Sequence, residues 1–575
     1  MTVLGVIFSV FLVLLIIGTV VVIIFDDGDS SKKIAWLLII ALLPVVGLLL
    51  YFMVGINFRQ SWYFKYKHKK FIEVFGERAD KRVFRLLFGH EKDSQVRREY
   101  RPLTRLLASD GSTCVTDGNG LEIITSGHRK FELLMEDLRN AKDHIHMEYF
   151  YFRQDKGSQQ IKEMLMQKAR EGVKVRFIHE NIANIAILPG YYNEMKKAGV
   201  QVEKFTKPRW PFVNMVTQLN YRDHRKIVVI DGKIGYTGGM NISDDYFVRW
   251  RDTHMRITGN AVAGLQYSFL NTWITADGEI DNDFSKYFPM CAELPALPSN
   301  DSAKSPVNAA AVDKVNANSS TESLKVAAAD SVNVSVAESV NAAAPSESLK
   351  VAAADQVKAV VPDYDEVEGN GIAEALAKTP IQSLDMSFKL KGRNRLIQIV
   401  PDEPESRWPN INMGAVWAVQ NAKKYIYIQT PYFVPPEPML QALQSAALSG
   451  VDVRVMVPKK ADLSFMGPAN RSYFTECLEA GIRIYERSGR FIHSKTFVSD
   501  DYLSEIGSAN MDFRSFNIDY ELNAYIYDIT AAKVNKAIFM KDMEASHEVT
   551  LEDWTARPWY QKFLQKVIRL FAPLL

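Results

Sequence analysis

The stretch HRKIVVIDG at residues 224–232 decides the fold, because HSKTFVSDD at residues 493–501 repeats its pattern. The match continues without a gap to an acidic residue in each copy. All matched positions are 269 residues apart, the interval from 224 to 493. The pairs are His224 with His493, Lys226 with Lys495, Asp231 with Asp500, Gly239 with Ser508, Asn241 with Asn510, and Asp252 with Glu521. We interpret the two blocks as half-sites of one active centre.

The blocks lie inside a longer duplication of alternating strands and helices. Apolar runs at 145–152 and 173–178 predict strands, and the amphipathic segment 159–171 between them predicts a helix. Similar segments recur in the same order, at 141–147 and 422–428, at 172–176 and 450–454, and at 198–202 and 480–484. This alternation predicts two α/β domains, at 120–291 and 364–575, that pack about a pseudo-twofold axis.

The residue types in the two blocks predict phosphodiester chemistry. Residues i and i+2 of a strand point to the same face, so each histidine projects together with the lysine that follows it. Each asparagine follows a glycine-containing turn, where backbone can approach a ligand closely. Two imidazoles, two ammonium groups and amide donors in one pocket suit a phosphoryl group, whose developing negative charge needs preorganised donors.

The expected mechanism divides the work between the two histidines. An ordinary pKa of about 6.5 allows one imidazole to be neutral and the other protonated at neutral pH. The neutral one attacks phosphorus and forms a phosphohistidine, and the protonated one donates to the leaving alkoxide and then deprotonates the incoming alcohol. Asp252 and Glu521 are candidates for holding the ring tautomers. Asp231 and Asp500 complete the catalytic signature, although at strand ends their favoured role is to fix a turn.

No metal or cofactor is expected. The lysines and amides supply the positive charge that a metal would otherwise bring to the phosphoryl group. The sequence has neither a Walker A loop nor a His-Glu-x-x-His motif. Its 3 cysteines are far apart and form no Cys-x-x-Cys pair, which agrees with a reducing compartment.

Two long uncharged stretches open the chain. Residues 1–25 and 34–58 contain no charged side chain, and each is long enough to cross a hydrocarbon core of about 30 Å. We predict a transmembrane hairpin over 1–58, in which the second span absorbs Pro44. A cleaved signal peptide is the alternative, but the first stretch lacks a basic start and a small-residue cleavage pattern. Lysines and arginines after residue 58 place both ends of the hairpin in the cytoplasm.

Three further segments have a composition of their own. The basic and aromatic connector at 59–119 is either an ordinary juxtamembrane segment or one that rests on anionic headgroups. Residues 292–363 have no aromatic residue and no glycine, so we predict a disordered insert, with a partner-binding segment as the alternative. The amphipathic pattern at 560–571 predicts a helix that packs on its own domain, with an interfacial membrane helix as the alternative.

The detail of the blocks resembles a known family. The doubled His-x-Lys-x4-Asp pattern is similar to the phospholipase D superfamily. YTGGMNI at 236–242, WRDTH at 250–254, QTPYF at 429–433 and GSANMDFRS at 507–515 resemble bacterial cardiolipin synthases. The resemblance covers most of 1–290 and 364–575.

The resemblance implies a multi-pass enzyme of the bacterial cell membrane that uses phosphatidylglycerol and other anionic phospholipids. It would transfer a phosphatidyl group from one phosphatidylglycerol to another and release glycerol. The resemblance also implies that His224 is the nucleophile and His493 the general acid and base. In the same way, it implies that Asp252 serves His493 and that Glu521 serves His224, each acid acting across the two copies.

Several alternatives remain open. The same chemistry with water as acceptor gives a phospholipase D, and with a headgroup alcohol it gives another phosphatidyltransferase. Phospholipase D-like nucleases share the blocks, but a net charge of +2 and the apolar hairpin argue against nucleic acid. A non-enzymatic membrane scaffold would have lost one of the histidines or lysines, and both blocks are intact. The sequence leaves the oligomeric state open.

Overall fold

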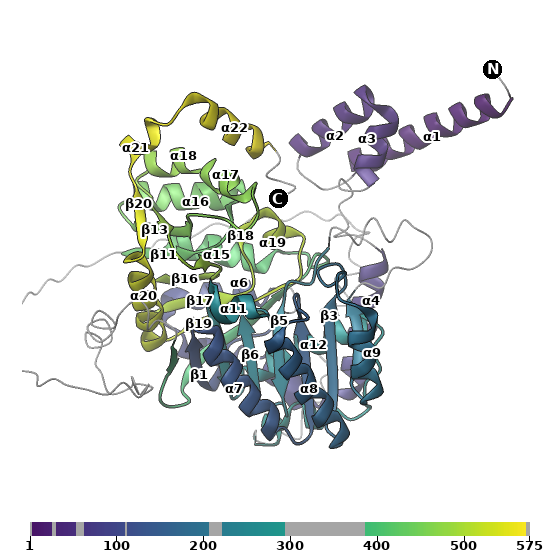
Figure 1. Ribbon diagram of the computed structural model, residues 1–575, viewed down its shortest axis with the longest axis vertical. Coiled ribbons are helices and arrows are strands. Elements are labelled where there is room, and N and C mark those ends of the chain that lie inside the picture. Colours follow the sequence, from purple (N-terminus) through teal and green to yellow (C-terminus); the bar gives the residue numbers. More distant parts are fainter. Residues whose placement is uncertain are drawn as a thin grey trace, which may run out of the picture.

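The computed structural model describes residues 3–25, 30–52, 62–109, 112–205, 221–293 and 386–570. The insert predicted at 292–363 lies outside these ranges except for its first two residues, so its character stays a prediction. The described chain forms one catalytic body with the N-terminal helices beside it, and Figure 1 shows the two copies stacked within that body.

One 16-stranded sheet runs through both copies. From its edge to the middle, the first copy has the order β4-β3-β2-β5-β6-β8-β1. The strands of this copy are β1 (Thr116–Ile124), β2 (His144–Tyr149), β3 (Lys174–Glu180), β4 (Gln201–Phe205), β5 (Lys226–Ile230), β6 (Ile234–Gly238), β7 (Trp250–Arg251) and β8 (His254–Thr258). Strands β2, β3 and β4 are parallel, and β5 pairs antiparallel with β2.

The second copy repeats this order as β14-β13-β11-β16-β17-β19-β10, with β20 added at its edge. Its strands are β9 (Ser387–Lys389), β10 (Arg395–Asp402), β11 (Tyr425–Gln429), β12 (Phe433–Val434), β13 (Asp452–Pro458), β14 (Arg483–Arg487), β15 (Phe491–Ile492), β16 (Thr496–Ser499), β17 (Leu503–Gly507), β18 (Met511–Asp512), β19 (Glu521–Tyr527) and β20 (Ser546–Val549). β1 and β10 pair antiparallel in the middle, so the sheet order is symmetric about this pair. The predicted duplication of an α/β unit is confirmed.

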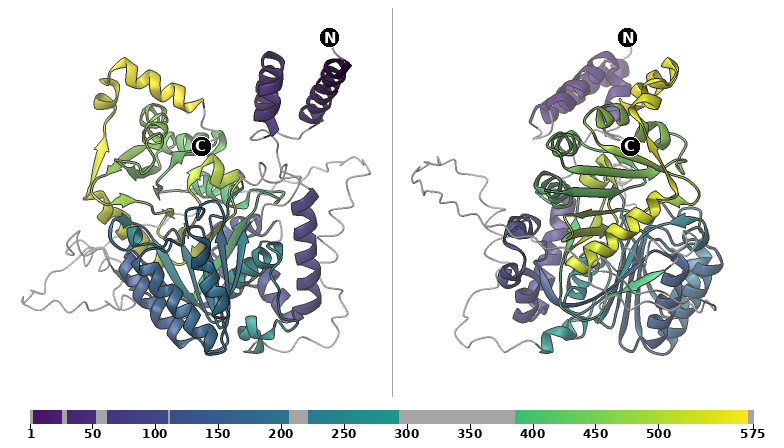
Figure 2. Two further views of the ribbon diagram at one scale, coloured as in Figure 1. Left: turned by 45° about the vertical axis from the view of Figure 1, so that its right-hand side comes forward. Right: turned by 90° about the vertical axis from the view of Figure 1, so that its left-hand side faces the viewer.

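Helices cover both faces of the sheet (Figure 2). On the first copy, α7 (Gly127–Asn140), α8 (Lys156–Arg170) and α9 (Pro189–Lys197) pack on one face, and α12 (Val262–Thr275) packs on the other. The second copy carries α15 (Asn410–Asn421), α16 (Glu437–Leu448), α17 (Met466–Arg471), α18 (Phe474–Glu479), α19 (Phe513–Asn517), α20 (Ile529–Met543), α21 (Leu551–Thr555) and α22 (Trp559–Arg569). Side chains of α12 and α20 share one hydrophobic cluster, which joins the two copies behind the sheet.

The connector after the apolar region packs on this body. It contains α4 (Trp62–Arg78), α5 (Lys81–Phe88) and α6 (Arg101–Leu107). Phe71 and Phe75 of α4 are buried, and each ring centroid lies 5.1 Å from that of Tyr267 in α12. This part of the connector therefore belongs to the catalytic fold.

The predicted transmembrane hairpin is present only in part. α1 (Val3–Phe25) contains one segment, Gly5–Phe25, that is long and apolar enough to cross a membrane, and it is the single such helix in the described residues. The second predicted span is divided into α2 (Ser30–Leu42) and α3 (Pro44–Leu50). The expectation that this span absorbs Pro44 is wrong. Proline lacks the N–H that continues a helix, and Leu43 before it leaves helical geometry at φ −133° and ψ 71°.

Candidate active site

Main-chain pairing between the copies positions both histidines. β15 pairs in parallel with β7, and the backbone N–H of His493 donates to the carbonyl of Arg251 over 2.8 Å. On the other side of the pseudo-twofold axis, the N–H of His224 donates to the carbonyl of Tyr520 over 2.9 Å. In each case the accepting residue directly precedes the acid of the other copy. The histidines lie just before β5 and β16, in the extended segments that lead into these strands rather than inside them.

Each acid consequently contacts the histidine of the opposite copy. Nδ1 of His224 lies 2.9 Å from Oε1 of Glu521, and Nδ1 of His493 lies 2.7 Å from Oδ2 of Asp252. This is the crossed pairing that the family resemblance implies. When Nδ1–H donates to the carboxylate, the other ring nitrogen, Nε2, carries the lone pair that can attack phosphorus or accept a proton.

Different residues support the two acids. The hydroxyl of Ser508 donates to Oε2 of Glu521, whereas the matched position Gly239 lies directly against Asp252. The backbone N–H of Thr253 donates to Oδ1 of Asp252 over 2.6 Å. Ser508 thus contacts one acid through a hydrogen bond, and Gly239 leaves the space that the carboxylate of the other acid occupies.

A substitution at Gly239 tests this support. A Cβ at this position would lie 2.2 Å from Oδ1 of Asp252, so the carboxylate must shift. We expect Gly239→Ala to lower kcat by about 10²-fold, because a displacement of about 1 Å at a catalytic group can cost that much. Steady-state kinetics with a thermal melt would check it. Ser508→Ala is the matched control, since that position already holds a Cβ and loses one hydroxyl. Wild-type kcat in Gly239→Ala would contradict the proposed fit.

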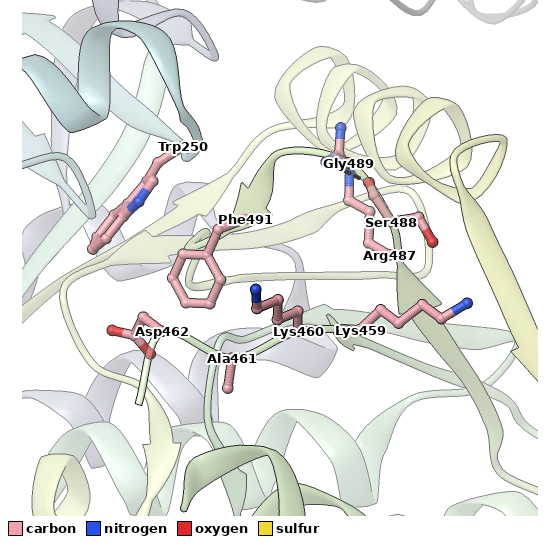
Figure 3. A pocket seen from close by; sticks show the side chains of 9 residues that line it. All are labelled: Trp250, Lys459, Lys460, Ala461, Asp462, Arg487, Ser488, Gly489 and Phe491. Carbon is pink, nitrogen blue, oxygen red and sulfur yellow. Dashed lines mark hydrogen bonds between the residues drawn. The ribbon is translucent and has the colours of Figure 1, made fainter. Parts of the chain in front are cut away.

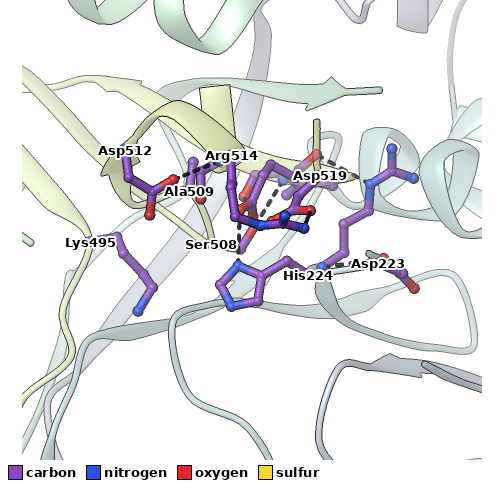
Figure 4. A network of polar contacts seen from close by, with 12 residues as sticks. Asp223, His224, Lys495, Ser508, Ala509, Asp512, Arg514 and Asp519 are labelled. Atoms are coloured by element: carbon purple, nitrogen blue, oxygen red, sulfur yellow. Dashed lines mark hydrogen bonds and ion pairs between the residues drawn. The ribbon is translucent and has the colours of Figure 1, made fainter. Parts of the chain in front are cut away.

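The two lysines lie at the histidines. Nζ of Lys495 is 2.6 Å from the carbonyl oxygen of His493 and 3.0 Å from its Nε2, and Nζ of Lys226 donates to the carbonyl of His224. Burial lowers the pKa of Lys226 to about 7 and that of Lys495 to about 8, although Glu521 and Asp252 act in the opposite direction. Figure 4 shows Lys495 and His224 reaching from opposite copies into the same space.

The histidines and lysines act on one another electrostatically, so they form one centre. Burial lowers the pKa of His224, and the charges of Lys226 and Lys495 lower it further against the attraction of Glu521. Burial, the two lysines and His224 hold the pKa of His493 well below its ordinary value.

Burial favours the neutral form of both acids, but the net shifts of their pKa values differ in direction. Burial raises the pKa of Asp252 to about 6, although Lys495 and Lys226 oppose the rise. Burial also opposes ionisation of Glu521, but His224, Lys226 and Ser508 together hold the pKa of its carboxyl below the ordinary value.

The two asparagines have different surroundings. Oδ1 of Asn241 accepts the backbone N–H of Tyr151 over 3.1 Å, and its amide donates to the hydroxyl of Tyr246 over 2.6 Å. Asn241 therefore supports the loop and an aromatic neighbour of His493. Oδ1 of Asn510 is buried and has no hydrogen-bond partner within the described ranges.

Asp231 and Asp500 do not join the centre. Asp231 directly follows β5 and Asp500 directly follows β16, at the ends of these strands that lie away from the histidines. Both residues have a left-handed backbone conformation, with φ 51° and 52°. The carboxylate of Asp231 accepts the backbone N–H groups of Lys142, Asp143 and His144, and that of Asp500 accepts those of Lys423, Lys424 and Tyr425. Placing them in the catalytic set is wrong, and their geometry is that of turn fixation.

Aromatic residues that the sequence reasoning missed make the site asymmetric. The rings of Trp250 and Tyr246 lie 5.0 Å and 5.5 Å from that of His493, and Phe150 lies 4.9 Å from that of His224. A pocket of about 390 Å³ adjoins the His493 side, where Trp250 and Phe491 form one wall (Figure 3). Its other lining residues are Lys459, Lys460, Ala461, Asp462, Arg487, Ser488 and Gly489. Trp250 lies two residues before Asp252, and Phe491 lies two residues before His493. This spacing could have identified both aromatic residues from the sequence.

Buried arginines join the half-sites. Arg225 donates to the carbonyl of Glu521 over 3.2 Å and pairs with Glu403 at 2.8 Å. At the corresponding place, Nη1 of Arg251 lies 3.2 Å from the hydroxyl of Ser494. Both guanidinium groups therefore link one copy's block to the other. Within the described part of the chain, no three His, Cys, Asp or Glu side chains are grouped to hold a metal ion.

Comparison with known proteins gives concordant matches. Residues 134–273 and 416–543 match the family described as "Cardiolipin synthase, PLD-like domain", and residues 13–55 match "Phospholipase_D-nuclease N-terminal". The chain is 31% identical to the major cardiolipin synthase ClsA of Bacillus subtilis (strain 168), over 100% of both chains. It is also 31% identical to a cardiolipin synthase of Halalkalibacterium halodurans, over 94% of this chain and 88% of that one. A third match, a cardiolipin synthase of Geobacillus kaustophilus (strain HTA426), is 31% identical over 94% of this chain and 88% of that one.

Proposed function

The chain belongs to the cardiolipin synthase family of the phospholipase D superfamily, and from that premise we propose that it transfers a phosphatidyl group between two phosphatidylglycerol molecules. The products are cardiolipin and glycerol. The observation that carries the proposal is the crossed pair of His–acid contacts, at 2.9 Å and 2.7 Å, with a lysine at each histidine. This centre supplies a nucleophile, a proton donor and two cations for a phosphodiester.

The proposed reaction has two displacements at phosphorus. Nε2 of one imidazole attacks, a P–N bond forms, and the P–O bond to the departing glycerol breaks as the second imidazole donates its proton. The second imidazole then takes a proton from a hydroxyl of the next phosphatidylglycerol. That oxygen attacks phosphorus, the P–N bond breaks, and cardiolipin leaves. Lys226 and Lys495 stabilise the charge on the phosphoryl oxygens in both steps.

We assign the attack to His224 and the proton transfers to His493, as the family resemblance implies. In the absence of substrate, burial and the lysines favour a neutral His493. A bound anionic diester beside that ring raises its pKa, because an opposite charge within about 4–6 Å favours the charged form. Substrate binding thereby prepares His493 to act as the acid.

The acceptor of the phosphatidyl group determines which reaction the enzyme catalyses, and one assay identifies this acceptor. The full-length enzyme would receive labelled phosphatidylglycerol as sole lipid, with a chelator present, and cardiolipin and free glycerol would be followed together. We expect the two products in equal amounts. Phosphatidic acid as the main product would reject the synthase in favour of a phospholipase D. A phosphatidyl ester of an added headgroup alcohol, formed in preference to cardiolipin, would identify another phosphatidyltransferase.

The pKa values predict a bell-shaped pH dependence of kcat/KM. As pH rises through about 6, Asp252 becomes a carboxylate and can hold the ring of His493, so activity rises. As pH rises through about 7 to 8, Lys226 and then Lys495 lose their charge, so activity falls. Initial rates from about pH 5 to about pH 9 would measure both limbs. Lys226→Arg keeps its charge and should remove the first part of the alkaline fall. A profile that stays flat above pH 7 would contradict the role of the lysines.

We also propose the placement of the chain in the membrane. Residues 1–58 anchor it in a bacterial cell membrane as a hairpin in which α1 is the first arm and the broken pair α2 and α3 forms the second. The two copies at 120–291 and 364–575 lie in the cytoplasm with the connector 59–119 before them. The apolar helix Gly5–Phe25, the family match over 13–55 and the lysines and arginines that follow residue 58 support this topology.

A further inference from the structure

The last described helix, α22, turns its apolar side away from the protein. Five large side chains of this segment are more than half exposed: Trp559 at 76%, Tyr560 at 57%, Phe563 at 63%, Leu564 at 53% and Leu570 at 77%. No residue of α22 is buried. A helix that packs on its own domain shows the opposite arrangement, with the apolar stripe toward the core. The expectation that this segment packs as a core helix is therefore wrong.

Polar and basic groups hold the other side of α22 to the body. Arg569 pairs with Glu476 and lies 4.3 Å from the ring centroid of Tyr473. Gln565 accepts a hydrogen bond of 2.8 Å from Arg557. Ile568 is the one residue of α22 that packs against the hydrophobic core of the second copy. The helix is thus fixed in place with its apolar side outward.

We propose that this outward side of α22 docks on the surface of an anionic phospholipid bilayer. Exposed Trp and Tyr are typical of a membrane interface, where one end of the ring is apolar and the other is wet. Lys566 is exposed beside the apolar residues on the same helix, where it can meet anionic headgroups, whereas Lys562 donates to the carbonyl of Thr555 over 2.8 Å. Large apolar side chains are also exposed singly elsewhere on the body, but several of them on one helix mark an interaction site.

The neighbouring structure extends the same surface. α22 packs on α17, and directly before α17 the side chains of Leu463 and Phe465 are 44% and 43% exposed. Figures 1 and 2 share a vertical axis, and in every view α22 and α1 lie toward the same end of the molecule. A second membrane contact at this end would fix the orientation of the catalytic body over the bilayer, which the apolar anchor alone leaves free to rotate.

A site-specific probe tests the docking directly. The native cysteines Cys114, Cys291 and Cys477 are buried, so an introduced cysteine can be labelled selectively. The full-length Phe563→Cys variant would carry an environment-sensitive fluorophore in vesicles of phosphatidylglycerol and phosphatidylcholine, with Gln160→Cys on α8 as the exposed control. We expect a blue-shifted spectrum and about twofold quenching by spin-labelled lipid at 563 only. An unquenched probe at 563 would overturn the proposal. A probe at 563 that is equally protected when the enzyme is an oligomer in detergent would also overturn the proposal, because it would identify a protein interface.

Activity gives a second measurement, which rests on the proposed function. Trp559→Ser with Phe563→Ser should lower kcat/KM on vesicle phosphatidylglycerol about fivefold or more, and leave it unchanged on a monomeric short-chain phosphatidylglycerol. The melting temperature should not change, because both side chains are exposed. Equal loss on both substrates, or no loss on vesicles, would overturn the docking. A wild-type enzyme that makes no cardiolipin from either substrate would instead reject the proposed function, and the fluorescence result would still decide the docking.

Discussion

Replacing either His224 or His493 by alanine should lower turnover by about 10⁴-fold or more, the scale found when one member of a cooperating catalytic set is removed. The structure gives the reason. Each histidine is held twice, because its backbone N–H donates to a carbonyl of the other copy and its Nδ1 contacts the acid of the other copy. Nε2 of each ring does not contact the acid, and Lys495 lies 3.0 Å from that of His493. The double variant should be no slower than either single variant, because the two groups act in one sequence.

A donor with an activated leaving group separates the two roles. A phosphatidyl ester of a nitrophenol needs no acid to expel its leaving group, so a variant that lacks only the acid can still complete the first step. With His224 as nucleophile, His493→Ala should release one burst of nitrophenol and trap a phosphohistidine at residue 224, and His224→Ala should show no burst. The reverse pattern would exchange the two roles. Substantial turnover of phosphatidylglycerol in both variants would overturn the two-histidine mechanism.

Asp252→Asn and Glu521→Gln should each lower kcat by about 10² to 10⁴-fold, because an amide can present its own N–H to Nδ1 and stabilise the wrong tautomer. Asp252→Asn should also remove the fall in kcat/KM below a pH of about 6, since the carboxyl whose pKa is raised to about 6 is gone. Steady-state kinetics over pH, with the histidine tautomers followed by nitrogen NMR, would measure both effects. Normal tautomers and normal kcat in these variants would show that the acids only support the fold.

Asp231→Asn and Asp500→Asn are the matched controls for these acids. The chemical change is the same, but these carboxylates accept backbone N–H groups in turns away from the histidines. We expect kcat to stay within about twofold while the free energy of unfolding falls by about 1–3 kcal/mol, the range for hydrogen bonds to a charged group. A loss of kcat as large as that of Asp252→Asn would return these aspartates to the catalytic set.

The repeated pattern of the chain predicted much of this fold. Apolar runs of strand length around 145–152 and 173–178 became β2 and β3, and the amphipathic stretch between them became α8. These elements follow from local periodicity, which a sequence displays directly. Local pattern did not predict the break at Leu43, where a long apolar stretch concealed the effect of Pro44 on the backbone. Nor did it predict the direction of α22, because an amphipathic pattern gives the two sides of a helix but not which one meets the protein.

The sequence by itself determined the two half-sites. The constant spacing of His224, Lys226 and Asp252 from their counterparts was enough to predict one phosphodiester centre and its chemistry. Only the tertiary structure decided which acid contacts which histidine, because that choice depends on main-chain hydrogen bonds from His224 to Tyr520 and from His493 to Arg251. It also decided that Trp250 and Phe491 make one side of the centre unlike the other. Contacts between residues hundreds of positions apart depend on how the two copies pack, and no local pattern encodes that packing.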